Sequence, residues 1–159
     1  MIQAIRETNF NAFIETKANR IAAVGASQIR HLVKFINDLD GAVFYAYANL
    51  ENIYDRYTQM AFVYNATPDR YTGLLNLIPA GYYKYEVYEV SWVSTSPTVA
   101  DGTAPETETD VLPVSDDNGV VEGLVAIGIL YLAEKSWSEE VQYTEYDQPA
   151  STNTIYYGQ

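Results

Sequence analysis

Apolar and polar residues alternate over several short stretches of the chain, which is the pattern of half-buried β-strands. The clearest alternation lies in residues 82–92, where Tyr83, Tyr85 and Val87 fall on one face and Lys84 and Glu86 fall on the other. The alternation is lost at residues 88–90, which indicates a bulge or a strand that is buried on both faces. This segment therefore predicts a strand with an irregularity near its end.

An Asp40-Gly41 pair separates two apolar stretches, residues 30–36 and residues 42–48. An Asp-Gly pair between strand-like segments is a strong signal for a two-residue β-hairpin turn. The first stretch also has apolar residues at helical spacing, but the turn and the β-like second stretch favour strands. The two stretches are therefore predicted to pair as antiparallel strands.

The other strand-like stretches are shorter or less regular, and residues 1–11 show no clear period. These stretches are residues 11–18, 54–64, 73–78, 120–133, 141–146 and 151–159. The apolar run at 120–133 contains Gly123 and Gly128, which predicts either one long bent strand or two short ones. About eight strands at short spacing predict an all-β fold, an antiparallel β-sandwich with extended terminal arms.

Residues 94–119 have a different character from the rest of the chain. They contain three prolines and no basic residue, and their acidic residues are Asp101, Glu106, Glu108, Asp110, Asp116 and Asp117. A loop of this length inside a compact domain is usually functional or disordered. We therefore divide the chain into a basic arm with a first strand at 1–28 and a sandwich domain at 29–159. The sandwich domain carries the acidic loop at 94–119 and a C-terminal strand or arm at 151–159.

The amino-acid composition supports a strand-rich fold and excludes sites that depend on cysteine. The chain has 15 tyrosines and 5 phenylalanines against 2 methionines, and aromatic residues suit a pleated, half-buried surface. It has no cysteine, which excludes disulfides and thiolate metal sites. The start of the chain lacks the apolar core of a signal peptide, and no apolar run reaches the roughly 20 residues of a membrane helix. We expect a soluble protein that is made in a cytoplasm and has no membrane partner.

The net charge of −12 is unevenly distributed. Residues 1–35 hold five basic and two acidic residues, so the acidic groups are concentrated in the remainder of the chain. An acidic body repels phosphate backbones, so nucleic acid is not expected as a partner. The basic N-terminal stretch is expected either to lie on an acidic neighbour or to form a solvated strand edge.

No residue pattern indicates a catalytic or metal site. His31 is the single histidine and is not part of a recognisable catalytic motif. Glu86 and Glu89, three apart on a strand, point to opposite faces unless a bulge intervenes, and so do not form a carboxylate pair. Residues 37–41 come nearest to a calcium loop, but their glycine comes too early, and no glycine-rich phosphate loop is present. We expect no catalytic residue, no metal, no cofactor and no enzymatic activity.

Several motifs resemble small, largely uncharacterised virion proteins of tailed bacteriophages. Pro79-Ala80-Gly81-Tyr82 followed by Lys84-Tyr85-Glu86-Val87-Tyr88 is similar to that family's Pro-Ala-Gly-Tyr/Trp and x-Tyr-x-Ile/Val-Tyr patterns. Phe35-Ile36-Asn37-Asp38, Leu124-Val125-Ala126-Ile127-Gly128 and the ending Tyr156-Tyr157-Gly158 are similar to other parts of the family pattern in the same order. The resemblance covers about residues 29–159, with Ala126 in place of the family's glutamate. It implies a virion component with a β-sandwich core, and it assigns no activity or site residue.

The resemblance and the absence of catalytic motifs predict a structural component of a phage virion. We expect an auxiliary capsid (decoration) protein whose partners are capsid or tail-connector subunits and copies of itself. The interface candidates lie near the two chain ends and are Arg6, Lys17, Arg20, Ile155, Tyr156 and Tyr157. Alternatives are a head–tail connector or tail ring protein, and a receptor- or glycan-binding adhesin domain that would need exposed aromatics such as Trp92 and Trp137. A hydrolase acting through His31 comes third.

Overall fold

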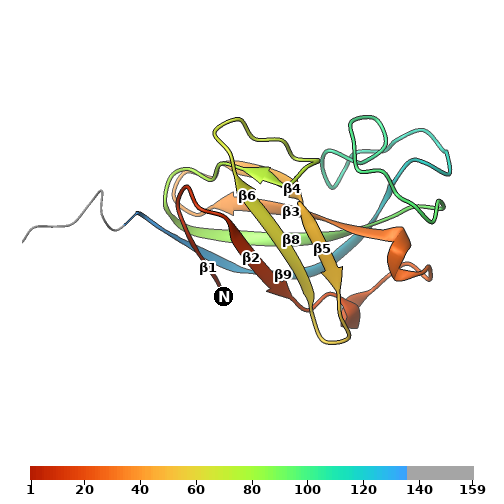
Figure 1. The fold of residues 1–159 in the computed structure, drawn as a ribbon, viewed down its shortest axis with the longest axis horizontal. Helices are drawn as coiled ribbons and strands as arrows, with labels where there is room; N and C mark the ends of the chain where they lie inside the picture. Colours follow the sequence, from red (N-terminus) through yellow and green to blue (C-terminus); the bar gives the residue numbers. More distant parts are fainter. Residues whose placement is uncertain (136–159) are drawn as a thin grey trace, which may run out of the picture.

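Two β-sheets that share one core make up residues 1–135, the part of the chain that this computed structural model describes (Figure 1). The larger sheet has, in spatial order, β1 (Ile2–Ile5), β9 (Val120–Ala133), β8 (Gly81–Ser91), β3 (Ile29–Asn37) and β4 (Val43–Tyr47). The smaller sheet has β2 (Phe10–Ile14), β6 (Thr58–Tyr64) and β5 (Leu50–Ile53), and β7 (Leu74–Leu75) pairs with β6. Two short 3-10 helices, η1 (Lys17–Asn19) and η2 (Ala26–Gln28), lie between β2 and β3. The predicted all-β sandwich is confirmed.

Strand directions are mixed, whereas the sequence predicted antiparallel strands alone. Most neighbours are antiparallel, but β1 runs parallel to β9 and β7 runs parallel to β6. Residues 1–135 contain nine strands, whereas the expected eight or so included two, at 141–146 and 151–159, outside this range. Pairing between strands that are far apart in sequence has no local signal, so the direction of β1 was not predictable.

The alternation in β8 defines the core as predicted. Tyr83, Tyr85 and Val87 are buried and pack with Phe35 of β3 and Phe62 of β6 between the two sheets. The register of β8 against β9 shifts after Val87 and again after Glu89, which confirms the irregularity expected at residues 88–90.

The hairpin of β3 and β4 is confirmed, but its turn is longer than the predicted two residues. The side-chain oxygen of Asn37 accepts hydrogen bonds from the backbone N–H groups of Leu39 and Asp40, at 2.8 Å and 3.2 Å. The N–H of Gly41 donates to the Asn37 carbonyl at 3.0 Å. The polar side chain of Asn37 therefore closes a wider turn in which Gly41 still supplies the positive φ of 73°.

The interpretation of residues 54–64 as one strand is wrong. The strand β5 ends at Ile53, the chain turns at residues 54–57, and β6 begins at Thr58. Within the turn, the N–H of Tyr54 donates to the carbonyl of Tyr57 at 2.9 Å. The turn was missed because it contains neither glycine nor proline, the residues that mark turns most strongly.

Residues 1–28, expected as a basic arm with a first strand, contribute one strand to each sheet. In β1, Ile2 and Ala4 are buried against the core, while Ile5 is exposed. Because an exposed isoleucine hides the alternation, residues 1–11 showed no period. The expected strands at 141–146 and 151–159 lie outside the described residues.

The acidic loop at 94–119 contains neither strand nor helix and lies at one end of the sandwich, at the upper right in Figure 1. It packs on Leu32 of β3 and Tyr47 of β4 on the outer face of the larger sheet. A second apolar cluster lies beneath it and consists of Leu32, Tyr47, Val90, Trp92 and Ala104. The indole N–H of Trp92 donates to the Thr103 carbonyl at 3.2 Å, and the Tyr47 hydroxyl donates to the Pro105 carbonyl at 2.7 Å. The loop is therefore part of the folded body. No helix within residues 1–135 is long and apolar enough to cross a membrane.

Candidate functional site

A cavity of about 160 Å³, lined by both polar and apolar side chains, lies at the end of the sandwich where η1, η2 and the β5–β6 turn meet. Its lining includes Thr16, Arg20, Ile29, His31, Ile53 and Glu89. In the register of the larger sheet, His31 of β3 stands directly opposite Glu89 of β8. The inner face at this end of the sandwich is therefore polar, although the rest of the core is apolar.

A buried ion pair between His31 and Glu51 joins the two sheets behind the cavity. Nδ1 of His31 lies 2.6 Å from Oε1 of Glu51, and only 3% and 4% of the two side chains is exposed. The backbone N–H of His31 donates to the other carboxylate oxygen at 3.2 Å. A carboxylate only accepts hydrogen bonds, so Nδ1 carries a proton and the second ring nitrogen, Nε2, is left for other partners. No group within residues 1–135 hydrogen-bonds to Nε2.

The carboxylate of Glu89 is also buried and binds backbone N–H groups. Its Oε1 accepts from Ala22 at 2.7 Å and from Ile21 at 3.3 Å, while its Oε2 has one long contact of 3.4 Å to Ile21. These bonds hold the segment between η1 and η2 against β8. Beside them, the hydroxyls of Thr16 and Thr58 share one hydrogen bond of 2.7 Å. Glu89 thus retains an oxygen that can accept another hydrogen bond.

Two basic side chains lie on the rim of the cavity, and only one of them forms an ion pair with the described residues. Lys17 Nζ forms an ion pair with Asp55 at 2.8 Å across the mouth. Arg20 is exposed, and its guanidinium has no hydrogen bond or ion pair with any residue of the described part of the chain. The Arg20 guanidinium is therefore available to bind a ligand at this site.

Three aromatic rings gather next to the cavity. Tyr54, which also lines the cavity, lies 5.1 Å from Tyr57 between ring centroids, and Tyr57 lies 5.6 Å from Phe13 in an edge-to-face arrangement. All three side chains are exposed large hydrophobics. Exposed aromatic rings in mutual contact form an apolar surface beside polar groups, a combination typical of ligand sites.

A second surface is the uncovered part of the outer face of the larger sheet, which we name the apolar strip. Its members are Ile5, Tyr82, Leu124, Ile127, Ile129 and Tyr131, all of them exposed. Tyr82 and Tyr131 are register partners whose ring centroids lie 4.9 Å apart. Exposed apolar residues that are contiguous rather than scattered indicate an interaction surface.

The acidic loop is fastened to the sheet through Glu108. Its carboxylate accepts hydrogen bonds from Lys34 Nζ and from the Tyr45 hydroxyl, each at 2.5 Å. Burial alone would raise the pKa of Glu108, but the hydrogen bonds from Lys34 and Tyr45 outweigh it and leave this pKa below its usual value. The hydrogen bond between Lys34 and Glu108 is also the main cause that raises the pKa of Lys34.

This anchor predicts that the loop loosens in acid. A carboxyl group whose pKa is lowered by folding stabilises the protein above its ordinary pKa, and this contribution is lost as the pH falls through the lowered value. We expect Glu108→Gln to cost about 1 kcal/mol at neutral pH and to reduce the further loss of stability below about pH 4. Urea unfolding across this pH range measures both effects. The control is Asp116→Asn in the same loop, and equal pH profiles for Glu108→Gln and the parent chain would contradict the anchor.

The interface candidates from the sequence have separate positions. Arg6 Nη1 pairs with Glu134 at 3.1 Å, so it joins the ends of β1 and β9. Lys17 pairs with Asp55, and Arg20 lies on the cavity rim, so these two come together at one site. Arg6 and Lys17 of the basic N-terminal stretch thus form ion pairs within the chain, whereas Arg20 forms none with the described residues. The candidates Ile155, Tyr156 and Tyr157 lie outside the described residues.

Other sequence expectations concern catalysis, metals and surface aromatics. Glu86 lies on the outer face, where its Oε1 is 2.7 Å from Lys84 Nζ. Glu89 points inward, so the two carboxylates do not form one site. Within residues 1–135 no group of three or more histidine or acidic side chains is placed to hold a metal ion. Trp92 is buried under the acidic loop, so it is not one of the exposed aromatics that the adhesin alternative would need, and Trp137 lies outside the described residues.

Sequence reasoning missed Glu51 and the aromatic cluster. Glu51 is twenty residues from His31 and belongs to the other sheet, so no spacing rule joins them. Tyr54 and Tyr57 are the first and last residues of the turn that was predicted as strand. Strand alternation does not apply in a turn, so it gave these two side chains the wrong faces. Recognition of that turn would have placed both tyrosines at an exposed loop tip.

No protein-family model, curated protein or solved structure matches the chain. The resemblance of residues 79–88 to tailed-phage virion proteins therefore stays a prediction.

Proposed function

We propose that the chain is a structural component of a tailed-bacteriophage particle and acts there as an auxiliary capsid (decoration) protein. The observation that carries the proposal is the apolar strip, which lies on the same sheet face that the acidic loop covers elsewhere. The Pro79–Tyr88 motif supports the virion context. A connector or tail ring protein would use the same kind of surface and is the alternative placement.

The partner of the apolar strip is a neighbouring virion subunit with a neutral or basic surface. A net charge of −12 disfavours close contact between two copies of the chain. The strip combines four exposed aliphatic side chains with two exposed tyrosines, and tyrosine is a residue type that is enriched in interface cores. Burial against a partner would remove this apolar surface from water.

A double substitution, Ile127→Thr with Ile129→Thr, tests this surface. Threonine keeps the β-branched shape that suits a strand, so the fold is retained while apolar contact area is lost. We expect incorporation into particles to fall at least about tenfold, since each tenfold step corresponds to about 1.4 kcal/mol. The measurement is the copy number of the chain in purified particles, by quantitative mass spectrometry.

The matched control is Val111→Thr with Val114→Thr, which changes two exposed aliphatic residues of the acidic loop. Normal incorporation of the strip variant would contradict the proposed interface, and absence of the parent chain from purified particles would contradict the virion role. Sedimentation of the isolated chain as a dimer that the strip substitutions dissociate would show that a second copy is the partner.

A further inference from the structure

The cavity beside His31 has unused hydrogen-bonding capacity inside it. Nε2 of His31 has no partner within the described residues, although 98% of this residue is buried. Nε2 is not completely sealed from solvent, and it is reached through the cavity that His31 lines. Oε2 of Glu89 has a single long contact. These two buried groups stand on directly opposite residues of β3 and β8.

The charges around the cavity balance one another. Lys17 and Arg20 are offset by Asp55 and Glu89, and His31 is offset by Glu51 behind it. A simple anion or cation therefore gains little from this lining. A neutral ligand whose groups both donate and accept hydrogen bonds matches it better, because guanidinium N–H groups donate, carboxylates accept, and Nε2 of the imidazole adds a further hydrogen-bonding atom.

The size and the lining of the cavity limit the range of ligands further. A volume of about 160 Å³ is close to that of a cavity of about 150 Å³ that accepts benzene, so the cavity has room for one six-membered ring. Substituents on such a ring would extend through the mouth of the cavity. Ile29 and Ile53 give the lining an apolar side, and Tyr54 presents an exposed ring at the mouth. The rings of Tyr57 and Phe13 continue this apolar surface away from the cavity.

We propose that the cavity binds one neutral sugar unit of a glycan. A pyranose ring has hydroxyl groups that both donate and accept hydrogen bonds, and an apolar C–H face that packs on aromatic rings. In the bound state its hydroxyls contact Nε2 of His31, Oε2 of Glu89 and the guanidinium of Arg20. Its C–H face, or the next sugar unit, packs on Tyr54.

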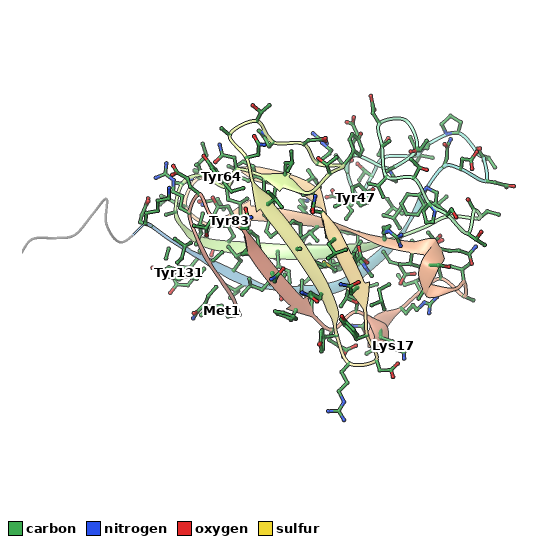
Figure 2. All side chains as sticks on the ribbon, viewed as in Figure 1. Met1, Lys17, Tyr47, Tyr64, Tyr83 and Tyr131 are labelled. Carbon is green, nitrogen blue, oxygen red and sulfur yellow. The ribbon has the colours of Figure 1, made fainter. Side chains whose placement is uncertain are left out.

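This site is independent of the apolar strip. Figure 2 shows Lys17, on the cavity rim, and Tyr131, in the part of the strip that also holds Tyr82, at different ends of the sandwich. The Tyr82–Tyr131 part of the strip can therefore be changed separately from the cavity.

The test is binding of neutral saccharides to the full chain. A glycan array selects the saccharide, and titration with glucose, galactose, mannose and N-acetylglucosamine follows the imidazole C–H signals by NMR. His31 is the only histidine in the chain, so these signals report on the cavity alone. We expect a saturable shift of the His31 signals with at least one neutral sugar. Tyr54→Ala and Arg20→Ala are each expected to weaken binding about tenfold.

The matched control is Tyr82→Ala in the apolar strip. Tyr54 is 47% exposed and Tyr82 is 53% exposed, and each is in contact with one other tyrosine ring, so the substitutions are equivalent in kind. Tyr82→Ala is expected to leave sugar binding unchanged. The proposal is overturned if no neutral saccharide shifts the His31 signals, if acidic saccharides alone bind, or if Tyr82→Ala weakens binding as much as Tyr54→Ala.

Discussion

Replacement of Glu51 by alanine is expected to lower the free energy of unfolding by about 3–5 kcal/mol. The carboxylate of Glu51 is the partner of both Nδ1 and the backbone N–H of His31, at 2.6 Å and 3.2 Å. Because both side chains are almost completely buried, loss of the carboxylate leaves the ring N–H and the backbone N–H of His31 without their protein partner. Urea unfolding at neutral pH, monitored by circular dichroism, measures the change.

The matched control is Asp55→Ala, which removes the carboxylate of the exposed ion pair with Lys17 near the same cavity. Exposed ion pairs contribute little, so the unfolding midpoint of this variant should stay at the parent value. A double variant with leucine at both His31 and Glu51 should recover most of the stability, because a buried pair is often replaced by apolar residues at no net cost. An effect of Glu51→Ala as small as that of Asp55→Ala would contradict the burial of the pair.

Gly73→Ala is expected to destabilise the chain by about 3 kcal/mol or more, through backbone strain and a clash. Gly73 has φ +75°, a left-handed conformation that side chains disfavour. A Cβ atom there would lie 2.1 Å from the backbone nitrogen of Asn49 and 2.7 Å from its Cα. Backbone atoms cannot rotate away as a side chain can, so the segment before β7 would have to move off the β4–β5 connection. Thermal and urea unfolding measure the loss.

Gly41→Ala provides the comparison that separates the two causes. Gly41 has nearly the same backbone angle, φ +73°, but a Cβ there meets no atom within 4 Å. The strain of the left-handed conformation alone should cost about 1–2 kcal/mol. The difference between the two variants therefore measures the clash with Asn49, and equal losses would show that the segment around Gly73 relaxes freely.

The sequence by itself determined the fold class and the parts of the fold that depend on local pattern. The alternation of Tyr83, Tyr85 and Val87 correctly gave the buried face of β8, because successive strand residues point to opposite faces. The Asp40-Gly41 pair correctly placed the β3–β4 hairpin, because few residues other than glycine accept the positive φ that such a turn requires. Where a turn lacked such residues, as at residues 54–57, the local pattern failed.

Only the tertiary structure decided which groups of the candidate sites come together. His31 meets Glu51 and Glu89 because β3 pairs with β8 in one sheet and packs against β5 of the other. Alternation predicts which residues share a strand face, but it does not predict which face another segment covers. The acidic loop covers Leu32 and Trp92 and leaves Ile127 exposed, although all three lie on strand-like stretches. Burial depends on contacts between segments distant in sequence, and these contacts are fixed only when both sheets and the loop have packed together.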